Sequence, residues 1–160
     1  MSAQPESFVP ALRAMCSADL DSVAAIENSI YTFPWGRAIF NDCLIAAYPC
    51  FVLEVDDTVV GYAIMSVAAA EGHILNLCVA ARLQRHGLGQ RLLDRLLELS
   101  NELQIERLFL EVRPSNTAAV TLYETNSFIH LGIRKGYYKA VEGREDALVL
   151  VRDFLAESKI

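Results

Sequence analysis

The strongest constraint on the fold of this chain is a leucine-rich segment with helical periodicity at residues 87–103. Leucines recur there every three or four residues and charged side chains occupy the opposite face, as in an amphipathic helix packed on a core. The stripe consists of Leu88, Leu92, Leu96, Leu99 and Leu103, widened by Leu93 and Leu97. Segments of strand type precede it at residues 73–79 and follow it at residues 107–113. Strands joined through a helix pair in parallel with a right-handed crossover, so this unit predicts a mixed α/β fold.

The other expected elements surround this unit. The helices are expected at residues 18–29, with Ser17 as N-cap, at residues 37–46, ended by Pro49, and from a cap at Asn116 to about residue 126. The strands are expected at residues 11–16, 50–55, 58–69, 128–138 and 146–154, with turns at Asp56-Asp57 and Glu71-Gly72 and a polar loop at residues 142–145. Hairpins join most of these strands, which predicts a mostly antiparallel sheet around one parallel pair.

Length and composition fit one domain, expected to span residues 1–160. The hydrophobic fraction of 53% is sufficient for a core. No apolar run reaches the ~18–20 residues that cross a bilayer, and the first ten residues lack the basic and apolar regions of a secretory signal. We therefore expect a cytoplasmic protein with no membrane partner.

Charge and metal-ligand spacing argue against two further classes of function. The net charge of −6 disfavours nucleic-acid binding, and it suits a basic peptide substrate as well as it suits solubility alone. The four cysteines form no CxxC pair, and the three histidines have no metal-ligand spacing. We expect no metal site and no disulfide framework, but buried or partly buried thiols in a reducing compartment.

The connection into the leucine-rich helix reads Gln84-Arg85-His86-Gly87-Leu88-Gly89. Glycines let the backbone approach a ligand, and the first N–H groups of a helix have no partner inside it. With the helix dipole, these features form a site for a pyrophosphate, to which Arg85 adds positive charge. The spacing differs from the GxxxxGK[ST] and GxGxxG loops, and a tight turn at a helix start explains the two glycines equally well.

This turn resembles motif A of the GNAT acetyltransferase superfamily, a Q/R-x-x-G-x-G/A turn between a strand and a leucine-rich helix. The segment of residues 110–124, which contains Leu110-Glu111-Val112-Arg113-Pro114-Ser115-Asn116, Ala118-Ala119 and Leu122-Tyr123-Glu124, resembles motif B in the right order and separation. The resemblance implies the GNAT fold and acetyl-CoA as cosubstrate, with the pyrophosphate in the turn. The coenzyme-binding residues that follow from it are Leu77, Cys78, Val79, Arg85, His86, Gly87, Leu88, Gly89, Gln90 and Asn116.

Backbone groups at residues 77–79 are expected to pair with the pantetheine arm like an added strand, with one N–H group facing the thioester oxygen. We interpret Cys78 as a space-filling side chain rather than a nucleophile. Asn116 is an N-cap, a coenzyme ligand, or both, because the helix start and the coenzyme are neighbours in the family.

The resemblance narrows towards the ribosomal-protein alanine N-acetyltransferases of bacteria. It covers residues 15–151 and is carried by Phe33-Pro34-Trp35, Gly136-Tyr137-Tyr138 and Gly143-Arg144-Glu145-Asp146-Ala147. It implies a protein N-terminus as acceptor, that of a basic small-subunit ribosomal protein beginning with alanine. Trp35, Tyr137 and Tyr138 would line the peptide groove, although core packing or a hydrophobic rim explains them too. The chain departs from the family at Ser127, where glycine is usual, which puts the local helix end in question.

Glu111 is the expected general base. Strand alternation places it with Phe109 and Arg113 on one face, opposite the apolar side chains at 108, 110 and 112. The residue pattern alone favours a surface glutamate paired with an arginine, and the resemblance assigns the base to this position. The acceptor amine must lose a proton, since an α-amine has a pKa of ~7.7–8 and lysine ~10.4. A glutamate pKa of ~4.3 is low for this task, so either burial raises it or a water relays the proton.

Tyr123 is the expected general acid. With a pKa of ~10 it stays protonated, and a thiol has a pKa of ~8.5, so proton donation to the leaving thiolate costs little. A core tyrosine that packs with Ala119, four residues earlier, fits the pattern equally well, and the resemblance favours the catalytic role.

Two other functions compete with N-terminal acetylation. One is a GNAT enzyme acting on a lysine or a small-molecule amine, against which the Phe33-Pro34-Trp35 and Gly136-Tyr137-Tyr138 segments argue. The other is a non-catalytic acyl-CoA-binding module, against which the presence of both Glu111 and Tyr123 argues. We expect a monomer.

Overall fold

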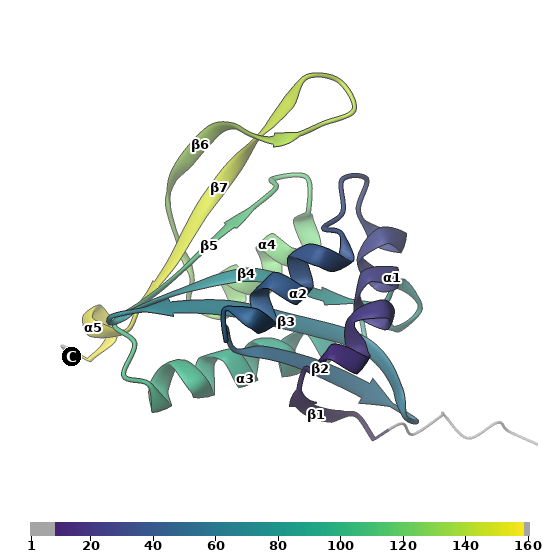
Figure 1. Cartoon of the computed structure of the whole chain (residues 1–160). Coiled ribbons are helices and arrows are strands. Elements are labelled where there is room, and N and C mark those ends of the chain that lie inside the picture. Colours follow the sequence, from purple (N-terminus) through teal and green to yellow (C-terminus); the bar gives the residue numbers. More distant parts are fainter. Residues whose placement is uncertain (1–8, 159–160) are drawn as a thin grey trace, which may run out of the picture.

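The computed structural model describes residues 9–158 and contains a seven-stranded sheet with the strand order β1-β2-β3-β4-β5-β7-β6 (Figure 1). The strands are β1 (Ala11–Ala14), β2 (Cys50–Val55), β3 (Thr58–Ala68), β4 (Glu71–Val79), β5 (Arg107–Val112), β6 (Ile129–Lys139) and β7 (Arg144–Asp153). Residues 1–8, which hold most of the segment used to argue against a secretory signal, and residues 159–160 lie outside the described part. No helix within residues 9–158 is long and apolar enough to cross a membrane.

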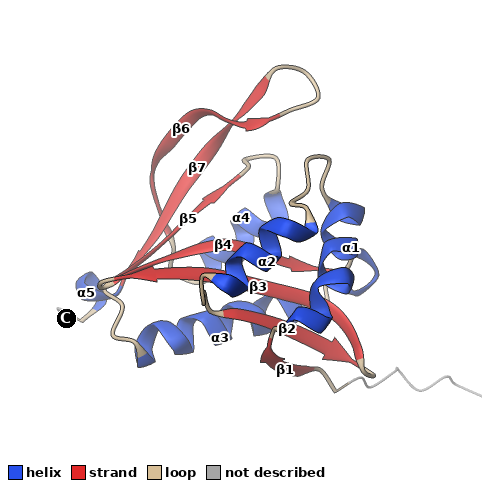
Figure 2. Cartoon of the chain, viewed as in Figure 1, coloured by secondary structure: helices blue, strands red, loops and turns tan. Residues whose placement is uncertain are grey.

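Helices cover both faces of the sheet (Figure 2). They are α1 (Leu20–Ile30), α2 (Arg37–Ile45), α3 (Leu88–Glu102), α4 (Thr117–Thr125) and α5 (Phe154–Glu157), with 3-10 turns η1 (Ser17–Asp19) and η2 (Ala81–Leu83). β4 and β5 pair in parallel and the other neighbouring strands pair antiparallel, so the predicted mixed α/β class is confirmed.

The two faces of the sheet form two apolar cores. On one face the leucine stripe of α3, with Leu92, Leu93 and Leu96 fully buried, packs against Leu108 and Leu110 of β5. This burial confirms both the predicted helix and the predicted alternation along β5. On the other face the core is formed by α1 and α2 packed on β2, β3 and β4; its largest members are Leu20, Phe40, Tyr62 and Ile64.

The parallel pair separates halfway along its length. β4 and β5 are in register from Glu71 and Arg107 as far as Ile74 and Leu110. At the next residue a β-bulge interrupts β4, because Ile64 and Met65 of β3 face Asn76 and Ile74 and leave Leu75 without a partner in β3. Beyond the bulge the two strands diverge (Figure 1). The backbone of β4 is therefore unpaired towards β5 over residues 75–79.

Three connections meet at the open end of this split. They are the α1–α2 connection, the β5–α4 connection and the tip of the long β6–β7 hairpin, which projects beyond the other strands in Figure 1. The hairpin has register shifts between His130 and Gly132 and between Arg134 and Tyr138, and such irregularities bend a strand out of the plane of its sheet.

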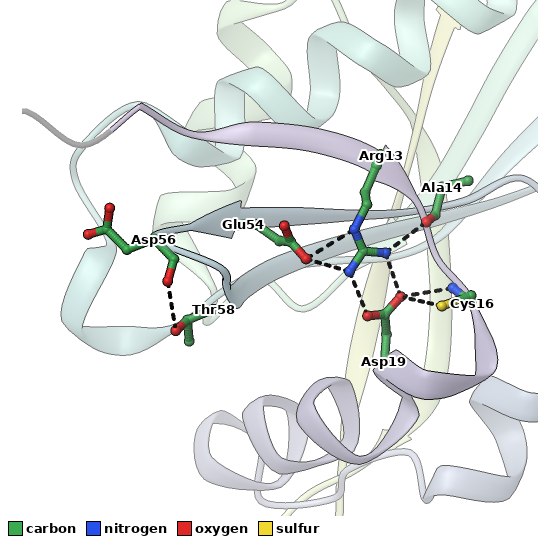
Figure 3. A network of polar contacts seen from close by, with 7 residues as sticks. All are labelled: Arg13, Ala14, Cys16, Asp19, Glu54, Asp56 and Thr58. Atoms are coloured by element: carbon green, nitrogen blue, oxygen red, sulfur yellow. Dashed lines mark hydrogen bonds and ion pairs between the residues drawn. The ribbon is translucent and has the colours of Figure 1, made fainter.

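The predicted N-cap at Ser17 is wrong. Asp19 is the N-cap of α1, and its buried carboxylate accepts the backbone N–H of Cys16 at 2.8 Å (Figure 3). Arg13 of β1 donates to both oxygens of Asp19, at 2.8 and 2.7 Å, and from Nε to Glu54 of β2 at 3.0 Å. The hydrogen bonds to Asp19 lower its pKa to about 2, and those from Arg13 make the largest contribution. The Asp19 carboxylate thus joins the start of α1 to Arg13 of β1 and to the backbone of Cys16.

The predicted turn at Glu71-Gly72 is wrong as well. The chain turns at Ala69 and Ala70, with Ala69 at φ +54°, and both Glu71 and Gly72 lie within β4. A Cβ atom at Gly72 would lie 2.9 Å from a methyl carbon of Leu108. This glycine therefore marks close packing between strand and core rather than a change of direction.

The other predicted elements are present, and their ends differ by up to two residues. The hairpin turn at Asp56-Asp57 is confirmed, with both residues at positive φ (51° and 62°), as a type I′ turn requires. Asn116 caps α4 by accepting the N–H of Ala119 at 3.2 Å. The predicted loop at residues 142–145 is shorter, since β7 already begins at Arg144, and α5 was not predicted.

Candidate active site

A cavity of about 450 Å³ lies where β4 and β5 separate. The sheet contributes residues 74–77 of β4 and residues 110–113, at the end of β5, to its walls. The remaining walls are formed by the end of α1 with the connection after it, by the start of α4 and by the β6–β7 tip. The predicted site residues that line it are Trp35, Leu77, Glu111, Asn116, Tyr123 and Tyr138. The split in the sheet thus brings both predicted catalytic residues to one space.

Glu111 enters this cavity from β5 with only 9% of its side chain exposed. Its Oε2 contacts Nε2 of His73 on the neighbouring strand β4, and its Oε1 lies 3.7 Å from Nη1 of Arg134 on β6. The contact with His73 outweighs desolvation and holds the pKa of Glu111 below its usual value. The alternative in which burial raises the pKa of Glu111 is therefore wrong. A carboxylate of this kind is ionised at neutral pH and suited to accept a proton through water.

Tyr123 enters the same cavity from α4 and is 6% exposed. Its ring packs edge-on against Phe128, with centroids 5.5 Å apart. Desolvation raises the pKa of Tyr123 above its usual value, so the hydroxyl keeps its proton throughout the neutral range. The packing role and the acid role considered from the sequence are thus compatible in one side chain.

The predicted phosphate-binding turn lies outside this cavity, at the start of α3. Gly87 is the N-cap of α3 at φ +76°, and Arg85 has φ +67°. A helix of 15 residues begins at Leu88, so its first N–H groups and dipole point out of this turn. A Cβ at Gly89 would lie 3.6 Å from Leu122 of α4, which places the helix start against the helix that carries Tyr123. Backbone donors, a positive dipole end and the Arg85 charge fit a pyrophosphate group.

Among the other positions predicted to bind the coenzyme, some would do so through the backbone and others through the side chain. Leu77 lines the cavity, while Cys78 and Val79 continue β4, whose backbone is unpaired towards β5. Burial raises the pKa of the Cys78 thiol, which agrees with a space-filling role. Gln90 exchanges two hydrogen bonds with Asn126, at 2.8 and 2.9 Å, and so joins α3 to α4. The side chain of Gln90 therefore holds the two helices together. His86 lies in the turn that precedes α3.

The aromatic residues predicted for substrate binding surround the mouth of the cavity. The ring of Trp35 packs against Phe40 at 5.3 Å. Tyr138 lies under the guanidinium of Arg113 at 4.3 Å and edge-on to Tyr137 at 4.8 Å. Tyr137, 44% exposed, lines a second hollow that it shares with Tyr138, Arg113 and the Phe33-Pro34 segment. The cavity and this second hollow share Phe33, Arg113 and Tyr138, so residues of the α1–α2 connection and of the β6–β7 hairpin line both.

Glu27 and His73 are functional candidates that the sequence analysis missed. Glu27 lines the cavity from α1 although it is only 3% exposed, and His73 contacts Glu111. The available signal for Glu27 was its spacing from the buried Leu20 and Val23, which places a carboxylate on the apolar face of α1. Within residues 9–158, no cluster of three or more histidine, cysteine or acidic side chains could hold a metal ion.

Comparison with known proteins defines the class to which this fold and site belong. Residues 20–128 match the model of the acetyltransferase (GNAT) family. The chain belongs to the GNAT family, and it is an acetyl-CoA-dependent N-acetyltransferase. The mixed α/β sheet described above is the GNAT fold.

Within the family, particular relatives are close in sequence and structure. The chain is 36% identical to the ribosomal protein bS18-alanine N-acetyltransferase of Escherichia coli K12 over 132 residues, which cover 82% of this chain and 89% of that one. It is 32% identical to the enzyme of the same name from Haemophilus influenzae, over 82% of this chain and 90% of that one. The crystal structure of the Escherichia coli ribosomal-protein-S18-alanine N-acetyltransferase superposes with a TM-score of 0.85 and 32% identity, over 91% and 94% of the two chains.

Proposed function

We propose that this chain acetylates the α-amino group of a protein N-terminus, and that the substrate is the alanine at the start of ribosomal protein S18. The observation that carries the proposal is the joint position of Glu111 and Tyr123 in the cavity between β4 and β5. The names of the relatives, which cover most of both chains, support the choice of substrate.

In this proposal Glu111 removes the proton of the attacking amine through a water molecule. Its lowered pKa leaves it ionised at neutral pH, and an α-amine releases its proton about two pKa units more readily than a lysine. A relayed carboxylate is therefore sufficient for an N-terminal amine. Tyr123 holds a proton for the sulfur that leaves, since burial raises its pKa and keeps the hydroxyl protonated.

Acetyl-CoA supplies the activated acetyl group as a thioester. We assign its pyrophosphate to the backbone of residues 85–90 at the start of α3, where Gly87 permits the left-handed turn. The pantetheine arm adds to the unpaired edge of β4 at residues 77–79, and a backbone N–H there polarises the thioester carbonyl. Asn116 caps α4 and also lines the cavity, so its amide faces both the helix and the coenzyme.

The peptide occupies the groove between the α1–α2 connection and the β6–β7 tip. Trp35, Tyr137 and Tyr138 line its walls, and a narrow groove holds an extended N-terminus through its backbone. The net charge of −6 attracts the basic N-terminal segment of a ribosomal protein. This electrostatic attraction becomes weaker as the salt concentration rises. The proposal includes a cytoplasmic, monomeric enzyme with no nucleic-acid or membrane partner.

Mass spectrometry of ribosomal proteins tests this proposal in cells. Deletion of the gene should remove the N-terminal acetyl group from S18, and re-expression should restore it. S18 that remains acetylated without the gene would contradict the proposed substrate. A lost acetyl group on a lysine side chain instead would favour the lysine acetyltransferase.

A further inference from the structure

Glu27 is a buried carboxylate whose position the acetyl-transfer chemistry does not explain. It lies on the face of α1 that packs on the sheet and is 3% exposed. A buried carboxylate is costly unless hydrogen-bond donors satisfy its oxygens. The hydrogen bonds that Glu27 accepts come from three neutral donors on three different parts of the chain. This arrangement indicates that the side chain joins those parts together.

Two of these donors belong to the sheet. The hydroxyl of Tyr62 on β3 donates to Oε1 at 2.7 Å, and Nδ2 of Asn76 donates to the same oxygen at 2.9 Å. Burial raises the pKa of Tyr62, so its hydroxyl remains a donor. Asn76 directly follows the bulged Leu75 and lines the cavity. One oxygen of Glu27 is thus fixed to the sheet at the beginning of the β4–β5 split.

The third donor belongs to the connection between α1 and α2. The backbone N–H of Trp35 donates to Oε2 of Glu27 at 2.9 Å. The Trp35 ring packs on Phe40, whose ring in turn packs on Tyr62 at 5.5 Å. The carboxylate and this aromatic stack therefore link the same loop to the same strand. The loop carries Phe33 and Trp35, both of which line the cavity.

We propose that Glu27 is a positioning residue that holds the Phe33–Trp35 loop against the sheet and so preforms the peptide-facing wall of the active site. The inference rests on the proposed function, because it takes this wall as the one that the acceptor peptide meets. Glu27 acts through the loop and touches neither the coenzyme turn nor Glu111. Its loss should therefore weaken peptide binding and leave coenzyme binding and proton transfer nearly intact.

The three donors differ in their ability to adapt, and this difference defines the test. A backbone N–H can only donate, so the Trp35 bond needs an oxygen. The Tyr62 hydroxyl can accept instead, and the Asn76 amide can turn to present its oxygen. Glu27→Gln therefore retains the Trp35 bond with its carbonyl oxygen, while its amide nitrogen faces the sheet. Glu27→Met has a similar length and no acceptor for this N–H, and Tyr62→Phe removes a sheet donor only.

Peptide kinetics should follow these substitutions. Glu27→Met should raise the KM for an alanine-start peptide about tenfold or more, the usual effect of losing a hydrogen bond to a charged group. Its kcat, its KM for acetyl-CoA and the shape of its pH profile should change little. Glu27→Gln should restore the peptide KM to within about threefold, and Tyr62→Phe should leave it near that of the parent protein. An unchanged peptide KM in a folded Glu27→Met protein would overturn the proposal.

The loop itself can be observed without any substrate, because Trp35 is the only tryptophan in the chain. Acrylamide quenching of its fluorescence should increase in Glu27→Met and stay at the parent level in Glu27→Gln. Hydrogen exchange of the Trp35 amide in the parent protein should be slow. This measurement does not depend on the folding of any variant. Rapid exchange there would overturn the positioning role even if peptides are acetylated normally. Slow exchange in a protein that acetylates no N-terminal amine would instead refute the proposed function alone.

Discussion

His73 and Glu111, on the paired strands β4 and β5, are joined by a contact between the imidazole Nε2 and the carboxylate Oε2. The carboxylate is nearly buried, and 36% of the His73 side chain is exposed. His73 therefore connects the proposed base to solvent and is the main reason that the pKa of Glu111 is low. In the proposed mechanism the ionised form of Glu111 accepts the proton, so the pH dependence of the reaction should depend on this pair.

We predict that His73→Ala raises the pKa of Glu111. Below the pKa of the amine, the logarithm of kcat/KM should fall with slope one as pH decreases, and then more steeply once Glu111 is protonated. The steeper limb should begin about 0.5–1 pH unit higher in His73→Ala, since the group that favours the charged carboxylate is lost. The matched control is His130→Ala, which removes a contact with the exposed Glu124. Identical profiles for all three proteins would contradict this role of His73.

Removal of either proposed catalytic group should slow the reaction. Glu111→Gln and Tyr123→Phe should each lower kcat by roughly 10²–10⁴, the usual contribution of a positioned base or acid. Binding of acetyl-CoA should remain, because neither group belongs to the turn at the start of α3. Glu124→Gln and Tyr48→Phe are matched controls at half-exposed positions. Steady-state rates within tenfold of the parent in both active-site variants would show that these roles are misassigned.

A negative charge at the start of α3 should weaken coenzyme binding. Gly87 has φ +76° and open space where a Cβ would lie, so Gly87→Asp and Gly87→Asn share the same backbone strain and nearly the same shape. Only the aspartate opposes a pyrophosphate electrostatically, and asparagine tolerates this conformation comparatively well. Calorimetry should give a Kd for acetyl-CoA at least about tenfold weaker in Gly87→Asp than in Gly87→Asn. Equal affinities would place the pyrophosphate elsewhere.

The departure from the family at Ser127 should cost stability. Ser127 adopts φ +70° immediately after Asn126, the C-cap of α4, in the left-handed region that glycine occupies without a steric penalty. We predict that Ser127→Gly raises the free energy of unfolding by about 1 kcal/mol, measured by urea denaturation. Ser29→Gly, inside α1, should lower it by a few tenths to about 1 kcal/mol. A Ser127→Gly protein less stable than its parent would show that the serine side chain compensates for the strain.

The positions of Glu111 and Tyr123 could be predicted because local patterns place them, while their catalytic roles rest on the family resemblance and stay predictions. Alternation along β5 puts Glu111 on the face opposite the buried Leu108 and Leu110, and the cap at Asn116 sets the start of the helix that carries Tyr123. The hairpin turn at Asp56-Asp57 was found for the same reason, since its chemistry is contained in adjacent residues. Such features depend on few distant contacts.

What was missed depends on residues far apart in the chain. The spacing of Glu27 from Leu20 and Val23 places it on the apolar face of α1, but two of the donors that satisfy its buried carboxylate, Tyr62 and Asn76, lie 35 and 49 residues away. Gly72 was taken for a turn because its contact with Leu108 crosses from β4 to β5. The carboxylate of the N-cap Asp19 is bound by Arg13, whose other partner, Glu54 of β2, lies 41 residues further along the chain.

The central claim, that the acceptor is an N-terminal α-amine, is tested most directly with two peptides. One is a basic hexapeptide that begins with alanine, and the other has the same sequence with a blocked N-terminus and a free lysine. We predict that the purified protein acetylates the first with the higher kcat/KM, because Glu111 acting through water suits an amine that releases its proton readily. Faster acetylation of the blocked lysine peptide would contradict the account and identify a lysine acetyltransferase.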